Sequence, residues 1–145
     1  MNAAPPGLLI VSHGRLAEEF RRALLRIIDA GATVAAVSIG WDDDTELAKG
    51  RIREGLDAVD GGGGVVVLTD MFGGTPANLA MTFCEPGRIE VVTGVNLPML
   101  IKFTNLRSNM TPRQLAEELA ERGRQAIQVA SGLLEGRPAE VEEAS

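Results

Sequence analysis

Short, uninterrupted apolar runs alternate along this chain with longer segments in which apolar residues recur every three or four positions. The runs have the length of buried strands, and the longer segments have the period of helices that bury one face. Strands that alternate with helices of about 10–15 residues are joined by right-handed crossovers and lie parallel. The alternation therefore predicts an α/β fold with an open, doubly wound, mainly parallel sheet sandwiched by helices.

The expected elements can be placed by residue number. Strands are predicted at Gly7–Ser12, Thr33–Ile39, Val65–Thr69 and Arg88–Thr93, and helices at Arg15–Ala30, Thr45–Val59, Thr75–Cys84, Leu97–Leu106 and from Thr111 to about Arg122. Ala126–Ser131 is a weaker strand candidate, and Gly132–Ser145 has acidic and small residues without periodicity. We expect one domain over residues 1–131 and a disordered acidic tail over residues 132–145.

Composition excludes several classes of protein. The chain has 145 residues and a formal net charge of −6, which argues against nucleic acid as the main partner. A single cysteine excludes a disulfide framework, and a single histidine excludes chemistry that needs two imidazoles. No window approaches the roughly 20 apolar residues of a membrane span, and no charged-then-apolar leader opens the chain. We therefore expect a cytoplasmic protein without a metal or cofactor.

Two polar residues follow the first and third predicted strands. His13 stands directly after the first strand, and Asp70 stands directly after the third. In an open parallel sheet, ligands bind beyond the carboxyl ends of the strands, near the point where the strand order reverses. A carboxylate that accepts a hydrogen bond from one imidazole nitrogen fixes the tautomer and leaves the other nitrogen as a nucleophile. The sequence thus predicts His13 and Asp70 as a catalytic pair.

Glycines and a hydroxyl follow Asp70. Gly73 and Gly74 allow the backbone to approach a bound group closely, and Thr75 with Pro76 has the pattern of a helix cap and first turn. Free N–H groups at such a helix start favour an anion, and a transferring phosphoryl group is one. We therefore expect Gly73, Gly74 and Thr75 to bind phosphate.

Further residues at the strand ends have two interpretations each. Trp41, Phe72, Asn96 and Leu97 could form a partner surface around the polar site, or Phe72 and Leu97 could pack on the sheet. Asp42, Asp43 and Asp44 could hold a metal ion, although acidic residues in this position are more typical of a helix cap that matches the helix dipole.

Three segments together resemble a known family. SHG after the first strand, DMFGGTPAN after the third and GVNLPML after the fourth are similar to the enzyme IIA component of the mannose family of the phosphoenolpyruvate:sugar phosphotransferase system (PTS). The resemblance covers roughly Gly7 to Ser131. It implies a phosphotransferase with the phosphoryl group carried on His13, Asp70 as the partner carboxylate, and Gly74 and Thr75 in the phosphate pocket. Phe72 and Thr75 replace a common Trp and Ser and keep their physical roles.

The resemblance also implies partners. The small carrier protein HPr would donate the phosphoryl group, and a IIB protein would accept it and link the chain peripherally to a membrane sugar permease. The family forms homodimers, partly by exchange of a short antiparallel C-terminal strand, for which Ala126–Ser131 is the matching segment. No IIB domain follows in this sequence, so we expect either that the acceptor is a separate protein or that there is no sugar acceptor.

Other functions compete with a transport carrier. A regulatory module could use the same phosphohistidine as a signal to partner proteins, and the residues do not separate this alternative from sugar transport. Chelatase-like metal-insertion proteins also begin with an apolar run and HG, but they bring further histidines to the metal. A nucleotide-binding domain would need a G-x-G-x-x-G or G-K-[ST] loop after a strand, and the sequence contains neither.

Overall fold

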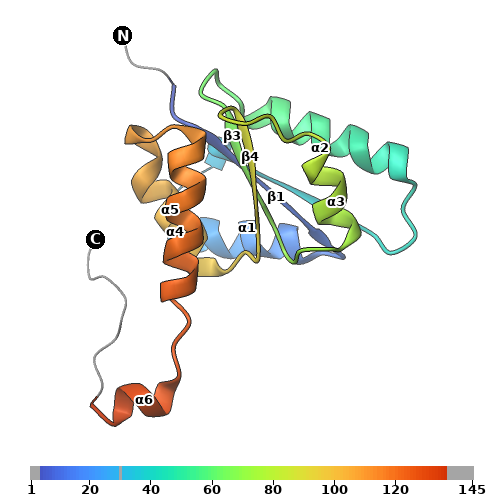
Figure 1. Cartoon of the computed structure of the whole chain (residues 1–145). Coiled ribbons are helices and arrows are strands. Elements are labelled where there is room, and N and C mark those ends of the chain that lie inside the picture. The colour runs from blue at the N-terminus through green and yellow to red at the C-terminus, as the bar shows by residue number, and fades with distance from the viewer. Residues whose placement is uncertain (1–3, 30, 137–145) are drawn as a thin grey trace.

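The computed structural model describes residues 4–29 and 31–136, which form alternating strands and helices (Figure 1). The strands are β1 (Gly7–His13), β2 (Val34–Ile39), β3 (Val65–Thr69) and β4 (Ile89–Thr93). The helices are α1 (Leu16–Ile27), α2 (Thr45–Val59), α3 (Thr75–Met81), α4 (Leu97–Leu106), α5 (Pro112–Gln125) and α6 (Ala130–Leu134), with short 3-10 turns at Gly31–Thr33 and Arg107–Asn109. In this part of the chain no helix is long and apolar enough to cross a membrane.

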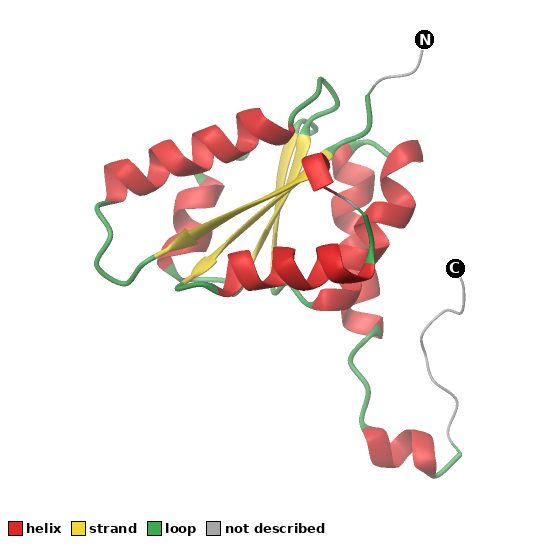
Figure 2. Ribbon diagram, turned by 180° about the vertical axis from the view of Figure 1, so that it is seen from behind, coloured by secondary structure: helices red, strands yellow, loops and turns green. Residues whose placement is uncertain are grey.

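The described strands, yellow in Figure 2, form one parallel sheet. Their order across the sheet is β2-β1-β3-β4. Strand β1 pairs with β2 on one side and with β3 on the other. The strand order therefore reverses between the two central strands, β1 and β3. The predicted α/β class, with a doubly wound parallel sheet, is confirmed.

Alternate residues of the central strands enter two separate cores. Leu8, Ile10 and Leu68 pack on the face covered by α1, α4 and α5, whereas Leu9 and Val67 pack on the face covered by α2 and α3. Figure 1 shows this division, with α4 and α5 on one side of the sheet and α2 and α3 on the other. Because both faces are covered, the strands read as continuous apolar runs in the sequence.

Several helix ends follow local signals, and two helices end earlier than predicted. Asp44 caps α2 by accepting a hydrogen bond from the Leu47 amide at 3.0 Å, which confirms a capping role within the acidic run. Helix α1 ends at Ile27 because Ile28 adopts extended backbone angles and packs against the core. Helix α3 ends at Met81. Beyond it, backbone amides up to that of Cys84 donate to the carbonyl three residues earlier instead of four, which makes a tighter turn.

Arginines from two helices cover the outer edge of β2. Arg21 of α1 donates from Nε to the Val34 carbonyl at 2.8 Å, and Arg51 of α2 donates from Nη2 to the Ser38 carbonyl at 2.7 Å. The two side chains approach the edge from opposite faces of the sheet, because α1 and α2 belong to different cores. Two carbonyl groups that a neighbouring strand would otherwise bind are thus occupied.

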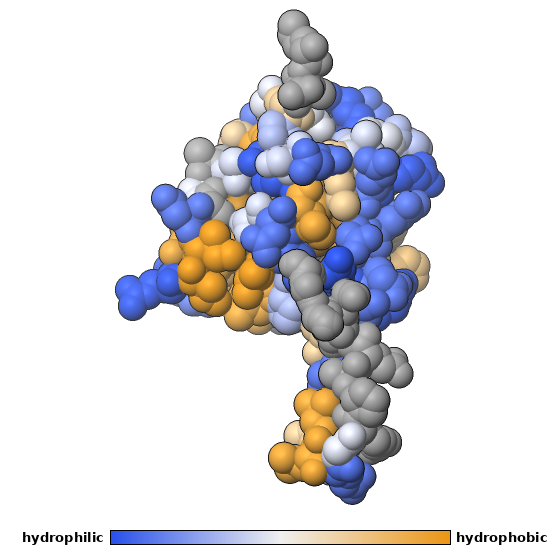
Figure 3. Space-filling view, turned by 90° about the vertical axis from the view of Figure 1, so that its left-hand side faces the viewer, coloured by the Kyte–Doolittle hydropathy of each residue, from blue (hydrophilic) through white to orange (hydrophobic). Residues whose placement is uncertain are grey.

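The segment Ala126–Ser131 is not a strand in the structure, which corrects the prediction for this single chain. Ala126 ends α5, a loop follows, and α6 begins at Ala130. The segment stands away from the sheet (Figures 1 and 2), so no described strand lies beside it to exchange backbone hydrogen bonds. The apolar side chains of this segment and of α6 are exposed, namely Ile127, Val129, Leu133 and Leu134, and they form part of the projection at the bottom of Figure 3.

The predicted tail begins inside a helix. The expected boundary between residues 131 and 132 falls within α6, which continues to Leu134. Residues 137–145, which make up most of the predicted tail, lie outside the described residues.

Candidate functional site

The ends of the two central strands place His13 and Asp70 next to each other. His13 is the last residue of β1, and Asp70 directly follows β3. The parallel register pairs Val11 with Thr69, so Asp70 leaves β3 beside the last residues of β1. This is the point at which the strand order reverses, where open α/β sheets bind their ligands.

Asp70 holds His13 through both its ring and its backbone. The His13 Nδ1 lies 2.8 Å from Asp70 Oδ2, and the His13 backbone amide donates to the same oxygen at 2.9 Å. The other carboxylate oxygen accepts from the Met71 amide at 3.0 Å. Because an ionised carboxylate only accepts hydrogen bonds, Nδ1 carries the proton and Nε2 keeps its lone pair. Nε2 is therefore the ring nitrogen that can act as a nucleophile.

The environment of Asp70 keeps its carboxyl group ionised. Burial by itself would raise the pKa of Asp70, but hydrogen bonds from the His13 amide and ring, together with attraction to the imidazole, outweigh burial and lower the pKa below its usual value. The carboxylate is therefore charged at neutral pH and can stabilise positive charge that develops on the ring.

The turn between β1 and α1 depends on two small residues. Ser12 is buried, and its hydroxyl accepts a hydrogen bond from the Ala17 amide and donates to the His13 carbonyl at 3.1 Å. Gly14 has a φ of +56°, and its amide donates to the Ile39 carbonyl at 2.8 Å. The serine of the SHG segment is therefore a structural anchor, which the sequence reasoning did not identify.

The glycine loop lies against the free nitrogen of His13. Gly73 has a φ of +89°, which favours glycine. A Cβ atom placed on Gly74 would lie 2.6 Å from His13 Cε1 and 3.0 Å from Nε2, so a side chain at this position would collide with the ring. The amides of both glycines have no acceptor among the residues that the structure describes. They are thus available to an anion bound at Nε2.

The cap of α3 differs from the prediction by one residue. Gly74 is the N-cap, and its carbonyl accepts the first helical hydrogen bond from the Asn78 amide at 2.9 Å. Thr75 is the first helical residue, and its hydroxyl makes no capping bond. Because Thr75 already lies inside the helix, Gly74 occupies the cap position, and glycine has no side chain with which to cap. Thr75 is exposed, and its hydroxyl is directed to no protein acceptor in the described chain.

A cavity of about 250 Å³ lies next to His13. Its walls come from the end of β1, the β2–α2 turn and the start of α3, and they include His13, Trp41, Asp43, Thr45 and Thr75. A phosphoryl group fits easily into this volume. The described residues contain no cluster of three or more His, Cys, Asp and Glu side chains that could hold a metal ion.

The four residues expected at a partner surface divide into two pairs. Trp41 and Phe72 are 79% and 73% exposed, respectively. Asn96 instead caps α4 and donates from Nδ2 to the Gly123 carbonyl at 3.1 Å, while Leu97 is half-buried against the core. Leu16 and Met71, which the sequence reasoning missed, are exposed and share a second hollow with His13 and Trp41.

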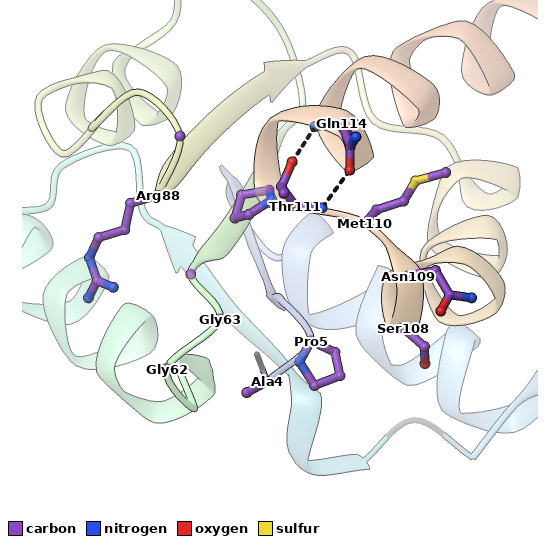
Figure 4. A pocket seen from close by; sticks show the side chains of 13 residues that line it. Ala4, Pro5, Gly62, Gly63, Arg88, Ser108, Asn109, Met110, Thr111 and Gln114 are labelled. Atoms are coloured by element: carbon purple, nitrogen blue, oxygen red, sulfur yellow. Dashed lines mark hydrogen bonds between the residues drawn. The ribbon is translucent and has the colours of Figure 1, made fainter. Parts of the chain in front are cut away.

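Another cavity, of about 470 Å³, lies at the opposite end of the sheet (Figure 4). Several of its polar groups are paired within the protein. Thr111 and Gln114 bond each other's backbone in a capping box, and Arg88 is bound to Asp60 at 2.7 Å. This cavity therefore offers few free groups, and the strand ends around His13 remain the candidate functional site.

Comparison with known proteins gives one consistent family. The family model EIIA-man, described as "PTS system fructose IIA component", matches residues 7–120. The PTS system fructose-specific EIIA component of Bacillus subtilis is 40% identical over 72 residues, which are 49% of each chain. The PTS system mannose-specific EIIAB component of Escherichia coli is 25% identical over 135 residues, 92% of this chain. The matches thus span 49% and 41% of the length of these two relatives.

A solved structure shares both the fold and part of the sequence. The mannose/sorbose-specific IIA subunit of the phosphotransferase system from Enterococcus faecalis superimposes with a TM-score of 0.75 and 31% sequence identity. The superposition covers 86% of this chain and 94% of that subunit.

Proposed function

From the premise that this chain belongs to the mannose-type EIIA family of PTS components, we propose that it is a phosphohistidine carrier with His13 Nε2 as the phosphorylated atom. The observation that supports this most directly is the contact between Nδ1 and Asp70 at 2.8 Å, which leaves Nε2 as the only ring nitrogen with a lone pair. Nε2 faces the glycine loop, whose free amides can bind phosphoryl oxygens.

The transfer step follows from these contacts. The lone pair of Nε2 forms a bond to phosphorus, while the bond between phosphorus and the donor's nitrogen breaks and that nitrogen keeps the electron pair. Positive charge develops on the His13 ring, and the Asp70 carboxylate stabilises it through the Nδ1 proton. The amides of Gly73 and Gly74 and the Thr75 hydroxyl stabilise negative charge on the phosphoryl oxygens. The return transfer to an acceptor uses the same groups in reverse order.

We infer that HPr is the donor and that a IIB protein is the acceptor, as in the family. Exposed apolar side chains surround His13, namely Leu16, Trp41, Met71 and Phe72. Apolar groups around a polar centre are typical of surfaces that dock proteins. The two partners would use this surface in turn, because each must bring its own reactive group to the same nitrogen.

The test is transfer of label from phosphoenolpyruvate in the presence of enzyme I and HPr. We expect an acid-labile, base-stable phosphoryl group on the protein, and we expect His13→Ala to carry none. A folded His13→Ala protein that still takes up label would place the phosphoryl group elsewhere. Loss of label to IIB in the presence of sugar would support the carrier role. Label that stays through every sugar tested, while the two phosphorylation states bind different proteins, would favour the regulatory alternative.

A further inference from the structure

The indole of Trp41 lies on the imidazole of His13. The centroids of the two rings are 5.0 Å apart, and their planes meet at 25°. Trp41 is 79% exposed, whereas the His13 side chain is only 19% exposed. Burial of the indole therefore contributes little to the stability of this contact, and the stacking of the two rings contributes most of it.

The turn that carries Trp41 is bound to its surroundings on both sides. The Gly40 amide donates to Asp43 Oδ2 at 2.7 Å, and the Asp43 amide donates to the Gly40 carbonyl at 3.3 Å. Arg51 of α2 contacts the same Asp43 carboxylate at 3.3 Å and the Ser38 carbonyl at 2.7 Å. Asp43 thus closes the turn around Trp41, and Arg51 fastens the turn to β2 and α2.

We propose that Trp41 is a positioning residue for phosphoryl transfer. Its indole holds the plane of the His13 ring so that Nε2 stays directed at the glycine loop. This inference rests on the proposed phosphorylation of His13 Nε2. A single hydrogen bond from Nδ1 to Asp70 allows the ring to pivot about that bond. The indole restricts the pivot from one face of the ring, and Gly74 restricts it at the Cε1–Nε2 edge. With three contacts the nitrogen is held in line for attack.

A small phosphoryl donor separates positioning from docking. Phosphoramidate phosphorylates histidine without a protein partner: Nε2 bonds to phosphorus, the P–N bond of the N-protonated reagent breaks, and ammonia leaves with the electron pair. If Trp41 only contacted partner proteins, its removal would leave this rate unchanged. If Trp41 positions the ring, the rate constant for Trp41→Leu falls by roughly two- to tenfold, the range to which the free energy of an aromatic pair converts. Trp41→Phe keeps a ring at this position and retains most of the rate.

The chain offers a matched control in its acidic run. Asp43→Asn weakens the contact with Arg51 and should give part of the loss seen for Trp41→Leu. Asp42→Asn removes the same charge one residue earlier, and Asp42 has no hydrogen-bond or ion-pair partner among the residues that the structure describes. We expect the Asp42→Asn rate to equal that of the unmodified protein.

Proton NMR of the only histidine gives an independent readout. A stacked indole shifts the His13 Cε1 and Cδ2 proton resonances by its ring current, and this shift should disappear in Trp41→Leu and persist in Asp42→Asn. A folded Trp41→Leu protein that reacts with phosphoramidate as fast as the unmodified protein, or faster, overturns the proposal. If the unmodified protein reacts with phosphoramidate but takes no label from HPr, the proposed PTS function fails while the positioning role stands.

Discussion

Substitution of Gly74 by alanine tests the close approach between the glycine loop and His13. The backbone of Gly74, at φ −90° and ψ 167°, is accessible to alanine without strain, so the added methyl group acts only through space. That methyl group would lie 2.6 Å from His13 Cε1, whereas carbon atoms in contact prefer about 3.5–4.0 Å. Relief of the overlap requires a shift of about 1 Å in the ring or in the loop.

The cost of that shift can be estimated from the site. If the ring moves, its hydrogen bond to Asp70, now 2.8 Å, lengthens beyond the useful range, and a displacement of about 1 Å at a reacting atom slows a reaction by roughly 100-fold. Overpacking of this kind lowers the free energy of unfolding by about 1–3 kcal/mol. We therefore expect a folded protein of slightly lower melting temperature that accepts phosphate from HPr about 100-fold more slowly.

Two further glycines provide the controls. Gly73→Ala puts a methyl group where no atom lies within 4 Å, but it imposes a φ of +89° on alanine, so its cost of about 1–3 kcal/mol should appear mainly in stability. Gly50→Ala lies in α2 with open space around it and should stabilise the helix by up to about 1 kcal/mol without any change in rate. Transfer to Gly74→Ala at the rate of Gly50→Ala would show that the loop does not confine His13.

Three other predictions concern charge and assembly. Asp70→Asn should keep the fold and slow phosphoryl transfer by roughly 10²–10⁴-fold, because the amide supplies no full charge to the ring and can stabilise the wrong tautomer. Rapid-quench labelling that gives the rate of the unmodified protein would remove Asp70 from the mechanism. Hydrogen bonds from Gly62 and Gly64 and the Arg88 guanidinium outweigh burial and lower the pKa of Asp60, so its ionised form stabilises the fold above about pH 4 and this contribution is lost as the pH falls through the lowered pKa. Asp60→Asn should therefore flatten the decline of melting temperature below pH 4, and an unchanged acid profile would contradict this. In sedimentation, a chain that ends at Arg124 should be monomeric or aggregated and one that ends at Leu134 dimeric, because the segment between them carries the exposed Ile127 and Val129; equal masses for the two chains would count against assembly through this segment.

Elements with strong local signals could be predicted to the residue. Helix α2 was predicted and is found at Thr45–Val59, because Asp44 marks its start. Helix α4 was predicted and is found at Leu97–Leu106, since Asn96 supplies its cap and Pro98 lies in its first turn. The pairing of His13 with Asp70 also followed from the sequence, because in a parallel sheet the carboxyl ends of neighbouring strands meet at one edge.

Contacts that depend on distant chain segments could not be predicted. The strand expected at Ala126–Ser131 has weak alternation, and a strand exists only where a neighbouring backbone completes its hydrogen bonds. The stacking of Trp41 on His13 depends on how the β2–α2 turn is closed by Asp43 and Arg51, and no periodicity in the sequence records that closure. For the same reason the sequence left two interpretations for Leu97, the partner surface or the sheet, and in the structure it packs against the core.

The arginines of α1 and α2 that bind the edge of β2 affect how copies of this chain could associate through their sheets. A sheet with two open edges can add neighbours indefinitely and grow into a fibre, whereas a sheet with one open edge can only pair once and stop. Arg21 and Arg51 occupy carbonyls along the β2 edge, which leaves β4 as the edge at which a strand from another molecule can join. We therefore expect any strand-mediated association of this protein to use β4, and we expect loss of both arginines to open β2 to a second neighbour.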